Sequence, residues 1–460
     1  MRLSRFWSRV AAPLVVLLGL VSCGGGGGGG GGGGVFPLPP PGATYTVGGT
    51  VTGLESGASL TLLNSDGDAL SVGSNGAFTF ATAIAGGSSY SVTVGAQPSG
   101  QNCRVSNGTG SNVSANVTSV RVSCAGAPEF AYVAQSFSDN IGIYKIDVST
   151  GALSSVGTVA AGASPFSIAV HPSKRFLYVA NTGDGTISIY AINQTTGALA
   201  QIGTDLPTGR YPQSIAVDPA GNVVYAANAL DNTVSVFAVD QGSGALTAIA
   251  GSPFSTVTSP VGVTVHPGGK FVYIASQIDN TITKYAIDQV SGAVLAAGAT
   301  SVPAGSSPTF VTLDAAGETM YVTGTKVTTF AIDSATGDLA QIGAPLTPNG
   351  TSSRVRVHPA GKFAYIPDGL GRTLSGYAVA PGSGVLSPLP DAPLATDNAP
   401  LDIAFNASGK FLVTANWNDD SISAYSINQK TGVLSSVGSV VNLDTRPRAI
   451  VTVQLPLSPT

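Results

Sequence analysis

Residues 176–222 read FLYVANTGDGTISIYAINQTTGALAQIGTDLPTGRYPQSIAVDPAGN, and this stretch decides the fold because the chain repeats it. Units of the same kind follow one another from Phe130 onward, and equivalent positions lie 44 to 48 residues apart. The tyrosine of the YVAN segment marks the repeat at Tyr132, Tyr178, Tyr225, Tyr273, Tyr321 and Tyr365, with Val413 in the seventh unit. A repeat of this length is typical of supersecondary units that stack against copies of themselves.

Each unit carries four strand-like runs, of the types SIAV, YVAN, TISIYAI and ALxxIG. Asp-Gly or Asp-Asn pairs such as Asp184-Gly185 suit a tight hairpin after the second run, and a Ser/Thr-Gly pair follows the third. Seven units of four strands predict an all-β chain with a seven-bladed β-propeller over residues 128–455. The first unit begins at its second strand, so we expect residues 447–453 to supply its innermost strand and close the ring.

The three histidines of the chain occupy one repeated position, in the turn after the innermost strand. They are His171, His266 and His358, and other units have Asp218, Asp314 and Asn406 there. These side chains share a short polar group that can bond nearby backbone, whereas asparagine cannot replace a general base. We therefore predict a turn role for the histidines and no catalytic role.

The N-terminal 43 residues read as a targeting segment and a tether. Three arginines and a short apolar run end in Leu20-Val21-Ser22-Cys23, which resembles a bacterial lipobox. The expectation is a lipoprotein signal peptide over residues 1–22 and a lipidated (palmitate-bearing) Cys23, the alternative being a plain signal peptide. Residues 23–43 then form a Gly/Pro-rich tether to the membrane. This predicts a lipid-anchored protein of the bacterial cell envelope, at the outer membrane or cell surface.

Residues 44–126 alternate apolar and polar side chains in several short runs separated by turn clusters. About seven short strands in roughly eighty residues predict a small immunoglobulin-like β-sandwich. Besides Cys23, the chain has Cys103 and Cys124, and an even pair in an exported chain predicts a disulfide bond. No histidine or third cysteine lies nearby in the sequence, so no metal site is expected.

Charge is scarce: 10% of residues are charged and the formal net charge is −4. This mildly acidic balance argues against nucleic-acid binding. No motif indicates a cofactor, and a monomer is expected.

The YVAN-type repeat resembles the seven-bladed lactonase-like propeller family (6-phosphogluconolactonase-like, YVTN repeats). The resemblance implies a propeller that hydrolyses or forms sugar-acid lactones with His, Arg and Glu around the mouth of its central channel. In such proteins the innermost strands often begin Pro-x-His. The third position of that frame here holds Ser167, Ser214, Gly262, Phe310, Arg354, Asp402 and Ala449. No histidine stands there, and none of the three glutamates lies in a predicted innermost strand, so the usual base of a lactonase is missing.

Arg354 and Arg356, Asp402, and Arg448 stand at the starts of innermost strands in three consecutive blades. The candidate ligand-binding residues of this sector are Arg354, Arg356, Asp402, Arg448, Trp417 and Arg372. Arginine pairs with carboxylate or phosphate, and tryptophan offers a flat face to a sugar or other ring, so we expect an anionic, carbohydrate-like or protein ligand. The alternative is that Arg354, Asp402 and Arg448 form channel-lining ion pairs. We favour a non-catalytic binding or scaffolding module; the alternative is a lactonase, a carboxylic-ester hydrolase.

Overall fold

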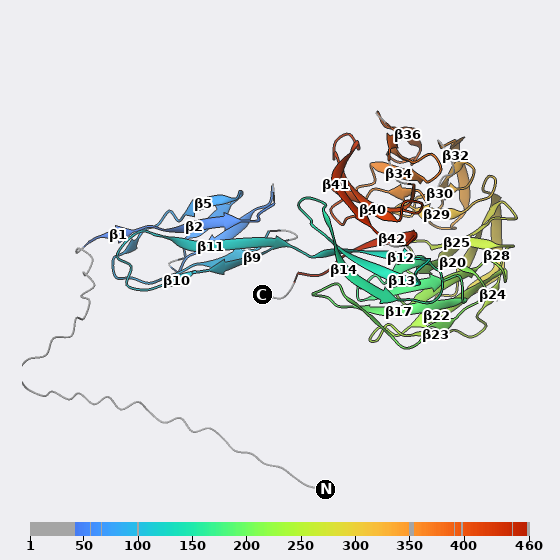
Figure 1. Ribbon diagram of the computed structural model, residues 1–460, viewed down its shortest axis with the longest axis horizontal. Helices are drawn as coiled ribbons and strands as arrows, with labels where there is room; N and C mark the ends of the chain where they lie inside the picture. Colours follow the sequence, from blue (N-terminus) through green and yellow to red (C-terminus); the bar gives the residue numbers. More distant parts are fainter. Residues whose placement is uncertain are drawn as a thin grey trace, which may run out of the picture.

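The computed structural model describes residues 42–457 except 56, 66, 99–100, 349–353, 391, 397–398 and 444. The predicted signal peptide, Cys23 and most of the tether lie outside these residues. No helix long and apolar enough to cross a membrane occurs in the described part of the chain. It folds into a small β domain and a seven-bladed β-propeller, joined where β11 leads into β12 (Figure 1).

The small domain consists of two main sheets packed on a shared core. The four-stranded sheet has the order β5 (Gly76–Thr79), β2 (Val47–Thr52), β11 (Val117–Gly126) and β9 (Gln101–Ser106), and β2 runs parallel to β11. The three-stranded sheet has the order β4 (Ala69–Val72), β3 (Leu60–Leu63) and β8 (Thr93–Ala96). Two short pairs complete the domain, β1 (Thr44–Tyr45) with β6 (Ile84–Ala85) and β7 (Tyr90–Ser91) with β10 (Thr109–Gly110). This is a β-sandwich, and its immunoglobulin-like character stays a prediction.

The predicted disulfide is present in this domain. Cys103 and Cys124 are directly opposite each other on the antiparallel strands β9 and β11, and their sulfurs are bonded. Both cysteines are buried in the core together with Val51, Leu60 and Leu62. The bond therefore ties the two strands through the interior of the sandwich.

The propeller blades are antiparallel sheets whose strands run outward from the central channel. Blade 1 comprises β42 (Pro447–Gln454), β12 (Glu129–Gln135), β13 (Asn140–Ile146) and β14 (Leu153–Ala160). Blade 2 comprises β15 (Pro165–Val170), β16 (Phe176–Asn181), β17 (Thr186–Ile192), β18 (Leu199–Gln201) and β19 (Leu206–Pro207). Blade 3 comprises β20 (Pro212–Val217), β21 (Val223–Asn228), β22 (Thr233–Val239), β23 (Leu246–Ala248) and β24 (Phe254–Ser255).

The remaining four blades follow the same plan. Blade 4 comprises β25 (Pro260–Val265), β26 (Phe271–Ser276), β27 (Thr281–Ile287) and β28 (Val294–Pro303). Blade 5 comprises β29 (Phe310–Leu313), β30 (Thr319–Thr323), β31 (Val327–Ile332) and β32 (Leu339–Leu346). Blade 6 comprises β33 (Arg356–Val357), β34 (Phe363–Asp368), β35 (Thr373–Val379), β36 (Leu386–Pro388) and β37 (Leu394–Ala395). Blade 7 comprises β38 (Pro400–Phe405), β39 (Phe411–Asn416), β40 (Ser421–Ile427) and β41 (Leu434–Asn442).

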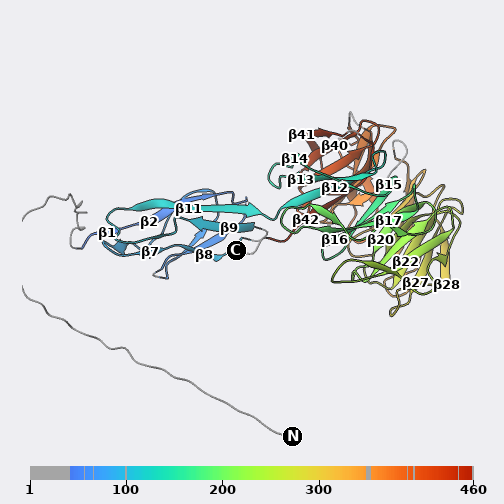
Figure 2. The ribbon, with the colours of Figure 1, turned by 60° about the horizontal axis from the view of Figure 1, so that its bottom comes forward.

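The ring closes as the sequence predicts. β42, at the C-terminal end of the propeller, pairs antiparallel with β12, from Glu129 opposite Gln454 to Gln135 opposite Pro447. β42 therefore provides the innermost strand of blade 1, and β12 has no open edge. In both views the small domain projects from the side of the ring where β12 lies (Figures 1 and 2).

The repeated tyrosine joins each blade to the next. Its ring is fully buried, and its hydroxyl donates a hydrogen bond to a glycine carbonyl in the following blade. The pairs are Tyr132–Gly197, Tyr178–Gly244, Tyr225–Gly292, Tyr273–Gly337, Tyr321–Gly384 and Tyr365–Gly432, with distances of 2.6 to 3.1 Å. Each glycine has a positive φ, which explains the invariable Ser/Thr-Gly turn of the repeat.

Candidate functional site

Two faces of the ring must be distinguished. We call the face with the starts of the innermost strands and the hairpins between second and third strands the top face. The bottom face carries the turns between first and second strands, including those with the histidines. The small domain contacts the bottom face, where Glu55 lies 3.6 Å from Lys410.

The third position of the innermost strands links neighbouring blades at the top face. The Ser167 hydroxyl accepts a hydrogen bond from the Ile215 N–H at 3.3 Å, and Ser214 does the same for Val263 at 3.1 Å. Asp402 occupies the equivalent position in blade 7 and accepts from the Ile450 N–H at 3.2 Å. Asp402 thus makes the same inter-blade hydrogen bond as Ser167 and Ser214, with a longer and charged side chain.

The remaining capacity of Asp402 is taken up by arginines of blade 6. Arg356 donates to both carboxylate oxygens at 3.1 and 3.2 Å, and Arg354 lies 3.9 Å away. The Ile403 N–H donates a further bond at 2.9 Å. Asp402 is only 5% exposed, so a buried charge is compensated by a bidentate guanidinium and two backbone donors. Both oxygens of this carboxylate are engaged in structural hydrogen bonds, so Asp402 does not provide a free general base.

Arg354 stacks on an aromatic ring as well as facing Asp402. Its guanidinium carbon is 4.7 Å from the centre of the Phe310 ring. Burial lowers the pKa of Arg354 to about 10, with the neighbouring Arg356 cation as a second cause. The group remains a cation at neutral pH, and it is the more weakly paired of the two arginines.

Arg448 lies among aromatic side chains instead of joining Asp402. Its guanidinium carbon is 4.0 Å from the ring centre of Phe166 and 4.8 Å from that of Trp417. Burial lowers the pKa of Arg448, and the nearby Tyr211 phenol partly opposes this shift. Arg446, beside it in sequence, lies over Phe137 at 4.8 Å and Trp417 at 5.5 Å. Among the described residues, neither arginine has a carboxylate within 4 Å, so both cations are held by ring faces.

Tyr211, which is 39% exposed, lies near Arg448. It precedes the first residue of β20 and has a φ of 60°, in the left-handed region that a bulky residue rarely adopts. The equivalent residues Ser164, Ser259 and Ser307 share this backbone conformation but are small. Strained residues gather at functional sites, and this one lies close enough to Arg448 to influence its pKa.

The acidic residues in the top-face hairpins have structural roles of their own. Carboxylates of Asp184, Asp231 and Asp279 accept backbone N–H bonds of 2.6 to 2.9 Å from the loop before the innermost strand of their own blade. Arg372 pairs with Asp419 at 2.9 Å, in the hairpins of blades 6 and 7. These interactions order the rim of the channel mouth.

The structure therefore divides the predicted site into three parts. Arg354, Arg356 and Asp402 form one ion-paired group, Arg448 and Trp417 form a stacked group, and Arg372 belongs to a separate rim pair. The alternative in which Arg448 joins the ion pairs is wrong, because its neighbours are aromatic rings. Sequence reasoning missed Phe137, Phe166 and Tyr211. Their signal was an aromatic residue beside the innermost strand start or in the hairpin. Tyr211 stands where other units have serines, whereas the positions of Phe137 and Phe166 also hold large apolar residues such as Leu230 and Val261 in other units.

The histidines lie on the bottom face, and their turn role is confirmed. Each Nδ1 accepts a backbone N–H two residues later, from Ser173, Gly268 or Ala360. No group of three His, Cys, Asp or Glu side chains suited to a metal ion occurs among the described residues.

The fold and this face define a seven-bladed β-propeller with an arginine- and aromatic-lined channel mouth. A family model for the lactonase, 7-bladed β-propeller matches in overlapping segments, residues 101–209, 162–263, 248–351 and 344–449. The chain belongs to this family.

Solved structures agree on the fold. A protein of Bacteroides uniformis assigned as a 6-phosphogluconolactonase is 22% identical, with a TM-score of 0.64 over 71% of this chain and 100% of the other. The periplasmic gluconolactonase of Pseudomonas aeruginosa is 21% identical, with a TM-score of 0.63 over 72% and 100%. A search of curated proteins found no relative.

Proposed function

We propose that the propeller is a binding module for a sugar-sized organic anion, held at the mouth of the channel by Arg448 and its aromatic neighbours. The observation that carries the proposal is the stacked Arg448, a cation among rings with no described carboxylate partner. A planar guanidinium stacked on rings keeps its N–H edges for a carboxylate or phosphate. Trp417 and Tyr211 supply ring faces and a hydroxyl for the rest of such a ligand.

The lipid anchor predicted from residues 1–23 places this module at the surface of an envelope membrane in our proposal. The disulfide in the small domain supports an oxidising compartment. The small domain contacts the bottom face, which leaves the channel mouth on the opposite side accessible to a ligand.

Binding is tested by calorimetric titration of the purified protein with gluconate and 6-phosphogluconate, with glucose as the neutral control. We expect the anions to bind and glucose to bind far more weakly. Arg448→Ala should weaken anion binding on the order of tenfold to a hundredfold, since it removes charge-assisted hydrogen bonds. Arg448→Lys should recover only part of the loss, because lysine keeps the charge without the flat fork.

The chain offers a matched control on the other face. Arg175 also stacks on a phenylalanine, with its guanidinium carbon 5.0 Å from the Phe176 ring centre, but it lies in a bottom-face turn. Arg175→Ala should leave anion binding unchanged. Equal binding by wild type and Arg448→Ala would refute the proposed site.

The second candidate function is hydrolysis of a sugar-acid lactone, favoured by family membership and by the relatives named for that activity. In the described part of the top face, Asp402, Asp231 and Asp419 are engaged in ion pairs and are therefore not free bases. Asp368 and Asp420, at the same face, each have one buried carboxylate oxygen without a hydrogen bond to any described residue, and they remain candidates for a base. Hydrolysis of glucono-δ-lactone above the spontaneous rate, lost in Arg448→Ala and retained in Arg175→Ala, would favour the enzyme over the binding module.

A further inference from the structure

The bottom face contains a feature that the channel mouth does not explain: the histidines fill some interfaces between blades and leave others open. Each imidazole Nε2 reaches a glycine carbonyl in the next blade. The pairs are His171–Gly221 at 2.8 Å, His266–Gly317 at 3.0 Å and His358–Gly409 at 2.8 Å. Because Nδ1 accepts a backbone N–H, Nε2 carries the proton and donates it to the carbonyl. The interfaces between blades 2 and 3, 4 and 5, and 6 and 7 are closed in this way.

The glycines that accept the histidine hydrogen bonds show how closely these interfaces are packed, through the distance from an added Cβ to its nearest neighbour. A Cβ added to Gly221, Gly317 or Gly409 would come within 2.3 to 2.7 Å of the histidine Nε2. The same addition at Gly269, the equivalent glycine of blade 4, would meet no atom within 4 Å. The space that an imidazole occupies at the closed interfaces is therefore empty between blades 3 and 4.

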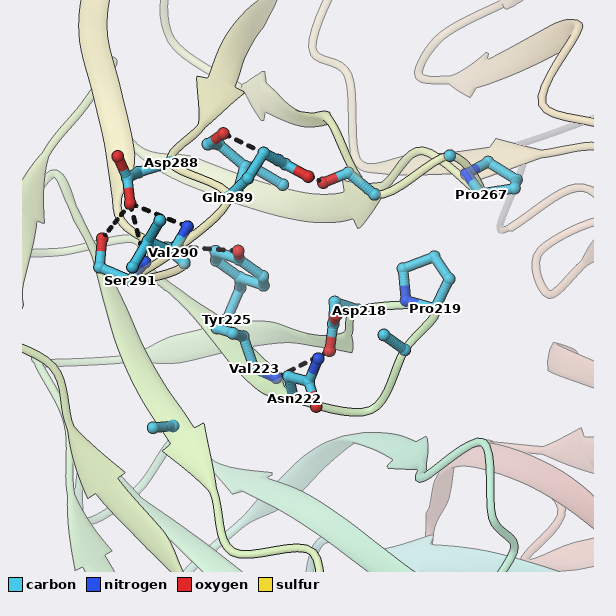
Figure 3. Close-up of a pocket in the computed structure, with 16 residues that line it drawn as sticks. Asp218, Pro219, Asn222, Val223, Tyr225, Pro267, Asp288, Gln289, Val290 and Ser291 are labelled. Carbon is cyan, nitrogen blue, oxygen red and sulfur yellow. Dashed lines mark hydrogen bonds between the residues drawn. The ribbon is translucent and has the colours of Figure 1, made fainter.

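Asp218 is the cause of this opening. It stands in the histidine position of blade 3, and its Oδ1 accepts the Val223 N–H at 2.7 Å within its own turn. The shorter side chain leaves a cavity of about 430 Å³ between the two blades. Figure 3 shows Asp218, Asn222 and Tyr225 on one side of this cavity and Asp288 and Gln289 on the other.

The lining of the cavity is negative and rich in acceptors. Asp218 and Asp288 line it, and no Lys, Arg or His does so among the described residues. Hydrogen bonds from the Ser291 backbone and hydroxyl lower the pKa of Asp288, so this carboxylate is ionised at neutral pH. No partner for Asp218 Oδ2 occurs among the described residues. The Gly269 carbonyl receives a 3.2 Å bond from the Gln289 amide, which leaves one of its two lone pairs available.

The walls are partly apolar. Pro219 and Pro267 border the opening, and the Tyr225 ring lies at the inner end with its hydroxyl committed to Gly292. A group that completes this interface as the imidazoles complete the others would be planar, positively charged and able to donate N–H bonds in its own plane. These are the properties of the imidazole that fills the closed interfaces, with a positive charge added to match the carboxylates.

We propose that this cavity binds a small planar nitrogen cation, an imidazolium or guanidinium group, which donates to the Asp218 carboxylate and the Gly269 carbonyl. The site lies on the bottom face and is independent of the anion site proposed at the channel mouth. The molecule's own histidines supply the template, since three other interfaces hold a planar N–H donor at the equivalent place.

The experiment uses the intact protein with imidazolium at pH 6 and methylguanidinium as probes, each at about 10 mM because a fragment of this size is expected to bind on the order of millimolar. Tetramethylammonium is the control with the same charge and no N–H. Binding is followed by ligand-observed NMR and by the melting temperature. We expect the two planar cations to bind and to raise the melting temperature, and tetramethylammonium to do neither.

Two variants locate the site. Asp218→His should close the interface, abolish probe binding and raise the melting temperature in the absence of probe. Asp218→Asn keeps the size and should weaken binding about tenfold or more. The control is Asp240→Asn, which removes the carboxylate at the same turn position as Asp288 one blade earlier, outside the cavity lining. It should leave binding unchanged.

The outcomes are decisive in each direction. Absence of binding to wild type, or equal binding by wild type and Asp218→His, overturns the proposal. If Asp218→His fails to fold, undiminished binding by Asp218→Asn overturns it instead. N-acetylarginine amide distinguishes the natural source once binding is seen. If N-acetylarginine amide binds, the ligand is an arginine side chain of a peptide. If it does not bind while the small probes do, the ligand is a free small molecule with the same planar cation.

Discussion

Removing Arg356 should destabilise the propeller, and a second substitution should rescue it. Asp402 is 5% exposed and accepts three hydrogen bonds from Arg356, whereas Arg354 is 3.9 Å away. Removing one partner of a buried ion pair lowers the free energy of unfolding by about 3 to 5 kcal/mol. Because Arg354 still faces Asp402, we expect Arg356→Ala to lower it by about 3 kcal/mol. For a propeller of about 330 residues that corresponds to a fall in melting temperature of roughly 4 °C.

The repeat itself provides the rescue. The positions of Arg356 and Asp402 are held in blades 2 and 3 by Ala169 and Ser214, and the serine still accepts the inter-blade N–H. The double variant Arg356→Ala/Asp402→Ser copies that solution and removes the unpaired carboxylate. We expect the double variant to be more stable than Arg356→Ala alone, with a coupling energy of about 2 kcal/mol or more.

Thermal and urea unfolding followed by circular dichroism measure this cycle with four proteins: wild type, both single variants and the double variant. The reasoning fails if Arg356→Ala melts within about 1 °C of wild type, or if the two single losses simply add. Either result would mean that Asp402 is not held as a buried, compensated charge. The same four proteins in the gluconate titration show whether the ion-paired group contributes to binding independently of Arg448.

Three further predictions follow from contacts described above. Tyr225→Phe leaves the Gly292 carbonyl without its 2.9 Å bond, and should cost about 1 to 2 kcal/mol of unfolding free energy in urea titrations; an unchanged midpoint would contradict it. Reduction of Cys103–Cys124, which are 21 residues apart, should cost roughly 3 kcal/mol in the small domain while the propeller transition stays in place, and calorimetry with and without reductant checks both parts. Desolvation raises the pKa of buried Glu129 above its ordinary 4.5, so its contribution to stability is complete below that pH and is lost as the pH rises through the raised value. Glu129→Gln should flatten this part of the stability profile, the fall in stability as the pH rises above 4.5, and parallel profiles for the two proteins would argue against it.

The sequence predicted the propeller well because its strands, turns and closing strand repeat seven times in register. Each copy confirms the others, as the six buried tyrosines and their glycine partners show. The candidate site was harder to predict, because it depends on side-chain direction between blades. Sequence spacing brought Arg354, Arg356 and Asp402 to one sector, but it could not show that Arg448 turns toward Phe166 and Trp417. The sequence predicted a turn role for the histidines. It could not predict the hydrogen bond from each imidazole to the next blade, because that bond depends on how two neighbouring units pack.

The closing strand has a consequence for the timing of activity. Arg448 belongs to β42, which is made last and pairs with β12, the first propeller strand to be made. A chain that ended before Pro447 would lack both the strand that closes the ring and the guanidinium of Arg448. A ligand that requires Arg448 would therefore not bind to such a chain. Under the proposed function, ligand binding at the channel mouth therefore requires β42 to be paired with β12, and a chain without β42 would not bind.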